Sequence, residues 1–297
     1  MSATERAAPS AARVPRARGG RGQPTPERPP HPEQPPRAEQ LAESGRPPTY
    51  GQPPAAERLP VSERLRVKLS FTEPALRTAL AGLWRTEGLL PRYRAYLCTM
   101  HAVIRASVPL MERAAERAAL LGRYGDPLSA SLVPYLDGHI REEAEHDAWL
   151  LEDLAAAGAD PRDAVDRMPD PLVASLAGAQ YYWIEHHHPI ALLGYIAVLE
   201  GHAPAAGLAP RLARLTGLPA PAFRTVHEHA HLDDGHSAEL HALLDRLPLS
   251  RGQETAIAVS ALHTTDALTQ LFVRLGRTVP DRPARGAERS VSMGGPS

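Results

Sequence analysis

The sequence predicts an all-α protein, a bundle of about seven helices joined by short connections, and three observations support this prediction. Between about residues 73 and 277, apolar residues recur at intervals of three and four, which is the period of an amphipathic helix. No segment of this region alternates polar and apolar residues as a strand does. The breaks that glycine and proline make in this pattern are short, and short connections are typical of neighbouring antiparallel helices.

Each periodic segment is bounded by a recognisable helix start or stop. Asp126 and Pro127 are typical of an N-cap and a first helical residue, and Gly158 and Gly217 are typical of helix ends. Pro109 and the His188-Pro189 pair fall inside periodic segments, where a proline is expected to kink a helix. Helices are predicted over about residues 73–84, 92–121, 127–157, 171–200, 208–215, 220–247 and 251–277.

The two ends of the chain differ from this core in composition. Residues 1–60 hold 14 of the 31 prolines, and the remainder is mostly Ala, Arg, Gly, Glu and Gln. Such a segment buries too little apolar surface to offset the entropy lost on ordering, so we expect residues 1–60 and 278–297 to be disordered. One domain is therefore predicted over residues 61–277.

Composition excludes several classes of function. The formal net charge is −1 and no basic face is apparent, which argues against a nucleic-acid-binding protein. No apolar run reaches the 18 or so residues of a membrane span, and no apolar secretory signal is apparent, so a cytoplasmic protein is expected. The single cysteine, Cys98, excludes an internal disulfide and a thiolate-rich zinc site.

The histidines are concentrated in the core, where 13 of the 14 lie between His101 and His263. In the predicted helix over 127–157, Glu143 and His146 are one turn apart on one face, and His139 and Glu142 fall on the same stripe. Bundle proteins use a Glu-x-x-His pair of this kind to bring a carboxylate and an imidazole to one iron ion. A surface helix that carries Glu and His residues without a function would have the same pattern.

A second cluster lies in the predicted helix over 220–247. His229, Asp233 and His236 are spaced by four and three residues, so their side chains share one stripe of the helix. His231 and Asp234 project elsewhere and are not expected to bind a metal. Nitrogen and oxygen donors without sulfur suit iron or manganese better than structural zinc, although a merely polar helix face has the same pattern.

Glu200 follows a strongly apolar run, residues 190–199. A glutamate at such a position is commonly a solvated helix end. Beside the ligands that the other two helices supply, however, its carboxylate could bridge two metal ions and complete the site.

At these residues the chain resembles the haem-oxygenase-like di-iron oxidases and oxygenases, a family of iron-containing redox enzymes. The resemblance spans about residues 93–247, and its most specific motif is His229-x-x-x-Asp233-x-x-His236. It implies a seven-helix bundle of the haem-oxygenase type in which two iron ions take the place of haem. The ligands that it implies are Glu143, His146, Glu200, His229, Asp233 and His236. Whether His139, Glu142 or Glu143 supplies the first ligand stays open.

The resemblance also implies a chemistry. Two Fe(II) ions would reduce O₂ to a peroxide that bridges two Fe(III) ions, and an amine, amino acid or carboxylic acid bound beside them would be oxidised. A small-molecule substrate is the expected partner, and an electron donor and a second copy of the chain are further candidates. Alternatives of the same fold are a haem-binding protein and a non-enzymatic helical scaffold. A thiamine-degrading relative would need a cysteine nucleophile, and Cys98 lies too early in the sequence for that role.

Overall fold

The computed structural model describes residues 59–277, apart from the side chains of Asp233 and Asp234. Helices account for most of this range and it contains no strand, which confirms the predicted all-α class. The predicted disorder of residues 1–60 and 278–297 falls almost wholly outside the described residues, so it stays a prediction, as does the 61–277 domain boundary. Among residues 59–277, no helix combines the length and the apolar character that a membrane crossing requires.

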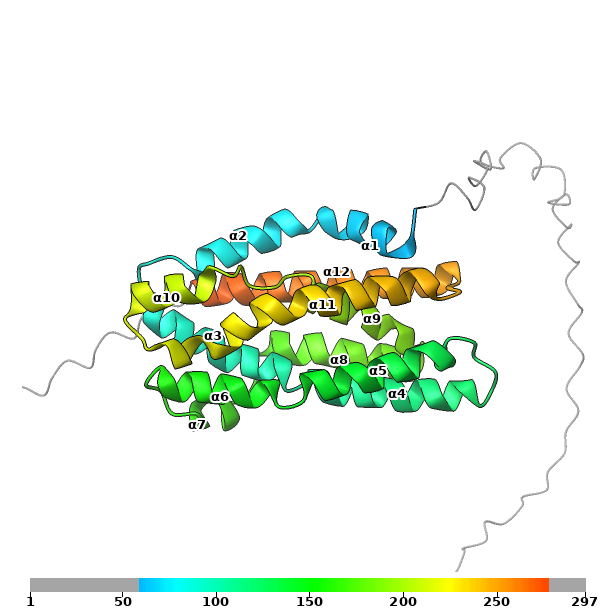
Figure 1. Ribbon diagram of the computed structural model, residues 1–297, viewed down its shortest axis with the longest axis horizontal. Coiled ribbons are helices and arrows are strands. Elements are labelled where there is room, and N and C mark those ends of the chain that lie inside the picture. Colours follow the sequence, from blue (N-terminus) through cyan, green and yellow to red (C-terminus); the bar gives the residue numbers. More distant parts are fainter. Residues whose placement is uncertain (1–58, 278–297) are drawn as a thin grey trace, which may run out of the picture. The chain divides into compact units, whose positions relative to one another are not determined.

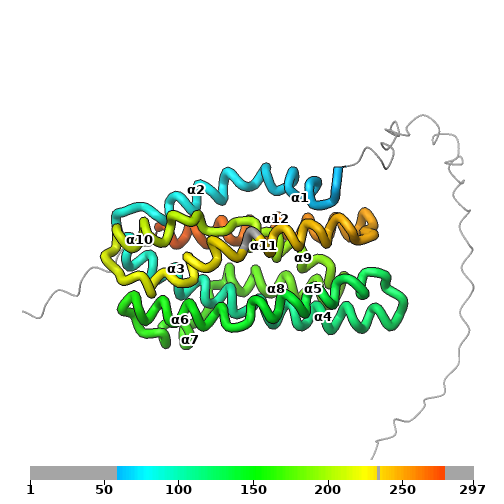
Figure 2. The backbone as a smooth tube through the Cα atoms, viewed as in Figure 1, coloured from blue at the N-terminus to red at the C-terminus, as the bar shows by residue number. Residues whose placement is uncertain are grey.

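The helices lie side by side as a bundle, in which α12 packs along α2 and α9 (Figure 1). Figure 2 shows the short connections between them. The helices are Val61–Ser70 (α1), Glu73–Leu83 (α2), Leu89–Ile104 (α3), Ser107–Gly122 (α4), Ser129–Glu143 (α5), His146–Ala156 (α6), Arg162–Val165 (α7), Pro171–His186 (α8), Leu192–Glu200 (α9), Leu208–Thr216 (α10), Arg224–Arg246 (α11) and Arg251–Gly276 (α12), with 3₁₀ helices at Pro189–Ala191 (η2) and Ala220–Phe223 (η3).

More helices are present than the seven predicted, because several predicted helices are broken. The predicted helix over 92–121 is interrupted at residues 105–106 rather than at Pro109. Pro109 lies in the first turn of α4, where a proline displaces no intrahelical hydrogen bond. The break predicted at His188-Pro189 is present, and η2 occupies it. α1 was not predicted, since only Leu65 and Leu69 of its ten residues are buried and its apolar pattern is weak.

The prediction of one continuous helix over 127–157 is wrong in a way that affects the site. α5 ends at Glu143, and α6 begins at His146 after a left-handed residue, Glu145, with φ 69°. A non-glycine residue in this conformation is uncommon and ends the regular helix. α5 also begins at Ser129 rather than after an N-cap at Asp126, whose carboxylate instead accepts a hydrogen bond from the Ser129 hydroxyl.

The buried side chains form two apolar cores. The larger core joins α1, α2, the end of α3, α4, α5, α8, α9, α11 and α12. The smaller core joins α3, α6, α7, α10 and the start of α11, around Tyr93 and Phe223. Because α5 packs into the larger core and α6 into the smaller one, the break between them lies where the two cores meet.

Gly194 fixes how closely α9 packs against α12. A Cβ atom at this position would lie 2.1 Å from the carbonyl oxygen of Ile257 and 2.7 Å from the backbone nitrogen of Ala261. Only glycine permits so close an approach of two helix backbones. This contact sets the position of the rest of α9, including Glu200 at its last residue.

Candidate metal centre

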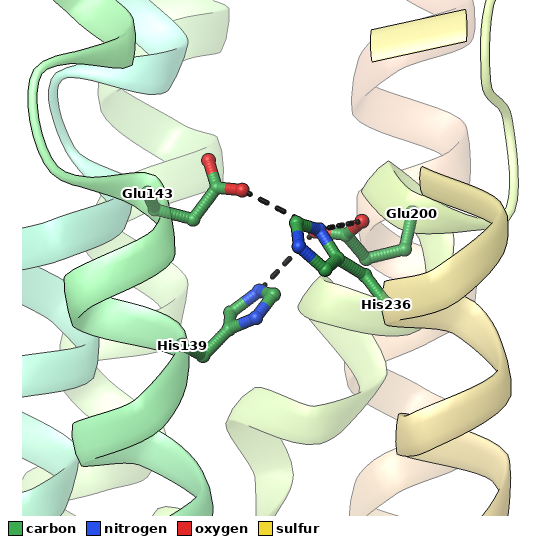
Figure 3. Close-up of side chains that lie close together, drawn as sticks. All are labelled: His139, Glu143, Glu200 and His236. Atoms are coloured by element: carbon green, nitrogen blue, oxygen red, sulfur yellow. Dashed lines mark hydrogen bonds and ion pairs between the residues drawn. The ribbon is translucent and has the colours of Figure 1, made fainter. Parts of the chain in front are cut away.

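Four side chains from three helices converge at the middle of the bundle. His139 and Glu143 come from α5, Glu200 from the end of α9 and His236 from α11, and one ligand atom of each lies within 4.8 Å of the others (Figure 3). We call these residues the first donor group. His236 lies between Glu143 and Glu200 and is directed at both carboxylates.

Close contacts hold the first donor group together. The Oε1 atom of Glu200 lies 3.2 Å from Nε2 of His139, and its Oε2 atom lies 3.1 Å from Nδ1 of His236. The same nitrogen of His236 is 3.6 Å from Oε1 of Glu143. The rings of His139 and His236 meet edge to face, with centroids 5.0 Å apart. Buried charged and polar groups are costly unless they are paired in this way or bound to a metal.

A second donor group shares Glu143 and adds two imidazoles. It consists of Glu143, His146 at the start of α6 and His229 on α11. Nδ1 of His146 lies 3.0 Å from Oε2 of Glu143, and the centroids of the His146 and His229 rings are 5.0 Å apart. Trp149, one turn along α6, packs on the His146 ring at a centroid distance of 4.0 Å.

Glu143 therefore belongs to both donor groups, and each of its oxygens faces one of them. The sequence suggested Glu200 as the bridging carboxylate, but in the structure Glu200 contacts only imidazoles of the first group. Glu143 ends α5 and His146 begins α6, and their side chains contact one another across the break at Glu145.

His229 is held in the form that a metal ligand needs. Its Nδ1 atom lies 2.9 Å from the carbonyl oxygen of Thr225, and since a carbonyl only accepts, Nδ1 donates the proton. A neutral ring then carries its lone pair on Nε2. Burial lowers the pKa of His229, which keeps the ring neutral.

The first donor group carries compensating charges in the absence of a metal. Burial alone would raise the pKa of Glu200, but hydrogen bonds from His139 and His236 outweigh it and bring the pKa to about 2. The hydrogen bond to Glu200 is the main cause that raises the pKa of His236 to about 9, against the opposing effect of burial. A carboxylate and an imidazole that stabilise one another so strongly are also a pair from which a cation can displace a proton.

The structure brings together five of the six predicted ligands, namely Glu143, His146, Glu200, His229 and His236. Asp233 lies on α11, and its side chain is outside the described part of the chain. His139, one of the alternatives for the first ligand, is buried in the first donor group beside Glu143.

Glu142, the remaining alternative, is in neither donor group. Its side chain is 48% exposed and lies 3.6 Å from His139 and 3.5 Å from His236, at the outer edge. His231, which was not expected to bind a metal, is exposed on α11.

A cavity of about 360 Å³ opens onto both donor groups. Apolar side chains dominate its wall, and they include Leu76, Leu80, Trp84, Met100, Ile104, Met111, Leu150, Ile196, Val198, Leu199, Leu208, Val226, Leu268 and Phe272. His139, Glu143, Glu200 and His229 also line it. A site of this kind, apolar with a few convergent polar groups, is typical of small-molecule binding.

Three polar features of the cavity were not anticipated from sequence. The hydroxyl groups of Ser107 and Tyr195 lie 3.1 Å apart on its wall, and burial raises the pKa of Tyr195 to about 12. Arg211, on the exposed side of α10, contributes a cation to the lining.

Cys98 does not line the cavity but packs on the smaller core, and burial raises the pKa of its thiol, which disfavours a nucleophilic thiolate.

The donor set fits iron. Every donor is a carboxylate oxygen or an imidazole nitrogen, the combination that suits non-haem iron, and the two groups together contain six described residues. Glu143 with His146 preserves the pairing that bundle proteins use for di-iron sites, although here the pair spans a helix break rather than one helical turn.

Comparison with known proteins bears on the fold and on the family. Residues 137–269, which include every predicted ligand, match a family described as "Iron-containing redox enzyme". No curated protein matches the chain.

Several solved structures are similar. A TenA homolog from Pseudomonas syringae pv. tomato has a TM-score of 0.57 at 14% identity, over 76% of this chain and 97% of that one. A CADD-like protein of unknown function from Nostoc punctiforme has a TM-score of 0.53 at 15% identity, over 73% and 95%. A domain of unknown function with a heme oxygenase-like fold, from Shewanella denitrificans, has a TM-score of 0.52 at 18% identity, over 72% and 88%.

At such low identities the structural likeness bears on the fold alone. It confirms the predicted bundle, and the family match supplies the evidence on chemistry. The resemblance predicted from sequence is thus confirmed: the chain adopts the haem-oxygenase-like fold and over residues 137–269 matches the iron-containing redox enzymes.

Proposed function

We propose that this protein is a non-haem di-iron oxidase or oxygenase, which holds two iron ions in its two donor groups and uses O₂ to oxidise a small molecule in the adjoining cavity. The observation that carries the proposal is the sharing of Glu143 between two adjacent donor groups. A carboxylate with one oxygen directed at each group is suited to bridge two cations, which a single-metal site would not require.

The residues of the chain would divide the work as follows. His139, Glu200 and His236 would hold one ion, His146 and His229 the other, and Glu143 both. Bound iron supplies the redox chemistry with O₂, and an electron donor would restore the ferrous state. The apolar wall of the cavity would exclude water and orient the substrate beside the ions.

The lining of the cavity favours one substrate class among the amines, amino acids and carboxylic acids considered from sequence. Among residues 59–277, Arg211 is the one Lys or Arg residue that lines the cavity, and the two glutamates of the lining belong to the donor groups. An apolar molecule with a single carboxylate would place its charge at Arg211 and its hydrocarbon part against the wall. A cationic amine would find no carboxylate outside the donor groups among the described residues of this lining.

Metal content tests the proposal. Protein loaded anaerobically with Fe(II) should bind close to two ions per chain, and exposure to O₂ should give a transient visible absorption. His229→Ala should lose one ion, whereas His231→Ala, an exposed neighbour on the same helix, should match the parent. One ion per chain in the parent, or a Soret band after addition of haem with no iron bound, would refute the di-iron proposal.

A further inference from the structure

We infer that Asp153 is a positioning residue for the metal centre: its carboxylate holds the first turn of α11 and thereby fixes the ring of His229 toward Glu143 and His146. The inference deepens the proposed function and rests on it only for the metal readout. No role was predicted for Asp153 from the sequence, because it belongs to neither cluster of histidines and carboxylates.

Asp153 links two helices of the site. It lies on α6 seven residues after His146, which places both residues on one face of that helix, two turns apart. Its side chain is fully buried. Oδ1 accepts a hydrogen bond from the backbone nitrogen of Arg224 at 3.1 Å, and Oδ2 accepts one from that of Thr225 at 2.9 Å.

These two N–H groups belong to the first turn of α11, where no intrahelical carbonyl is available to them. Phe223, at the N-cap position, offers no side-chain acceptor. The cap is therefore supplied by another helix, and a carboxylate can satisfy both donors at once because it has two oxygens. A negative charge at this end also interacts favourably with the dipole of α11.

The chain of contacts continues from Thr225 to the metal centre. Its nitrogen is held by Asp153, and its carbonyl oxygen accepts the Nδ1 proton of His229 at 2.9 Å. The anchor for the imidazole is thus the residue that Asp153 fixes. Partners of this kind set the tautomer and the orientation of a metal-ligating histidine.

Two further contacts join α6 to the same turn of α11. The guanidinium of Arg224 lies 4.4 Å from the centroid of the Trp149 ring, and its Nη1 atom is 2.6 Å from Glu152. Trp149 in turn packs on His146. Asp153 is the buried member of this joint, and burial raises its pKa to about 6 in spite of the hydrogen bonds from Thr225 and Arg224. A fully buried carboxylate is a costly cap, which favours a role in positioning over one in stability alone.

Asp153→Asn tests the inference, since the amide offers an acceptor to one N–H and turns a donor toward the other. The matched control is Asp170→Asn, where Oδ1 of Asp170 caps α8 by accepting from the backbone nitrogen of Leu172 at 2.9 Å, remote from both donor groups. In metal-free protein, ¹⁵N NMR of the histidine rings should show a single Nδ1–H tautomer of His229 in the parent and the control, and a mixture in Asp153→Asn. In Fe(II) titrations, Asp153→Asn should weaken one of the two binding steps by about 10–100-fold, with the other unchanged.

A parental tautomer and parental affinities in Asp153→Asn would overturn the inference, and so would an equal loss in Asp170→Asn. If the parent binds fewer than two ions, the proposed function fails, and the tautomer comparison still decides the role of Asp153. If Asp153→Asn does not fold, Asp153→Ser, which keeps one acceptor, is compared with the parent in the same two measurements.

Discussion

Gly194→Ala should destabilise the protein and weaken iron binding, although residue 194 touches no ligand. The new methyl group would lie 2.1 Å from the carbonyl oxygen of Ile257 and 2.7 Å from the nitrogen of Ala261. Both atoms are backbone atoms of α12, so no side chain can rotate out of the way. α9 must therefore move away from α12 by roughly 1.4 Å before the carbon–oxygen contact reaches an ordinary separation of about 3.5 Å.

The magnitude follows from the same geometry. Forcing one extra carbon into a tightly packed interface costs about 1–3 kcal/mol. For a domain of this size that cost corresponds to a fall in Tm of roughly 2–12 °C. Because Glu200 ends α9 six residues later, a shift of the helix also displaces the carboxylate that joins His139 and His236. A displacement of this order at a ligand is expected to lower iron affinity by at least about tenfold.

Gly178→Ala is the matched control. Gly178 lies on α8, is exposed, and has no atom within 4 Å of an added Cβ. Alanine in an open helical position stabilises by about 0.4–1 kcal/mol, so the two variants should shift Tm in opposite directions. Thermal unfolding followed by circular dichroism, together with iron analysis, measures both effects. Equal Tm and iron content in Gly194→Ala and the parent would refute the packing argument.

Three further predictions concern the donor groups and the cavity. Glu143→Gln should lose both ions, with affinity at each falling by more than about 10–100-fold, because Glu143 serves both groups; metal analysis that finds one ion at parental affinity would contradict this. Arg211→Ala should weaken the binding of an alkyl carboxylate by about tenfold, or about 1.4 kcal/mol, because the charge that pairs with the carboxylate is lost. Calorimetry should show no change in the binding of the matching alkyl alcohol. An equal loss of affinity for the acid and the alcohol would argue against charge recognition. In metal-free protein, the raised pKa of His236 contributes stability that is complete below pH 6.5 and is lost as the pH rises through about 9. The free energy of unfolding measured in urea should therefore fall over that pH interval. His236→Ala should make this fall with pH smaller.

The fold class could be predicted from the sequence, and so could most residues of the two donor groups. Helical periodicity depends only on which side chains are apolar, so it can be recognised without a structure. The spacing of His229 and His236 likewise placed both residues on one face of the helix that became α11. The clusters contain no cysteine, which favoured a site built from nitrogen and oxygen donors over a thiolate site. The family matched over residues 137–269 is one of iron-containing enzymes.

The division of these residues into two groups could not be predicted, because it depends on contacts between helices. Helical spacing relates a side chain to its own helix, whereas the break at Glu145, the close crossing at Gly194 and the contact of Asp153 with α11 depend on packing between distant segments. The left-handed conformation of Glu145 could not be predicted from its neighbours in the sequence, because it is unfavourable locally. The packing of the two cores on either side of the turn offsets that strain. For this reason Glu143, rather than Glu200, is the carboxylate that the two donor groups share.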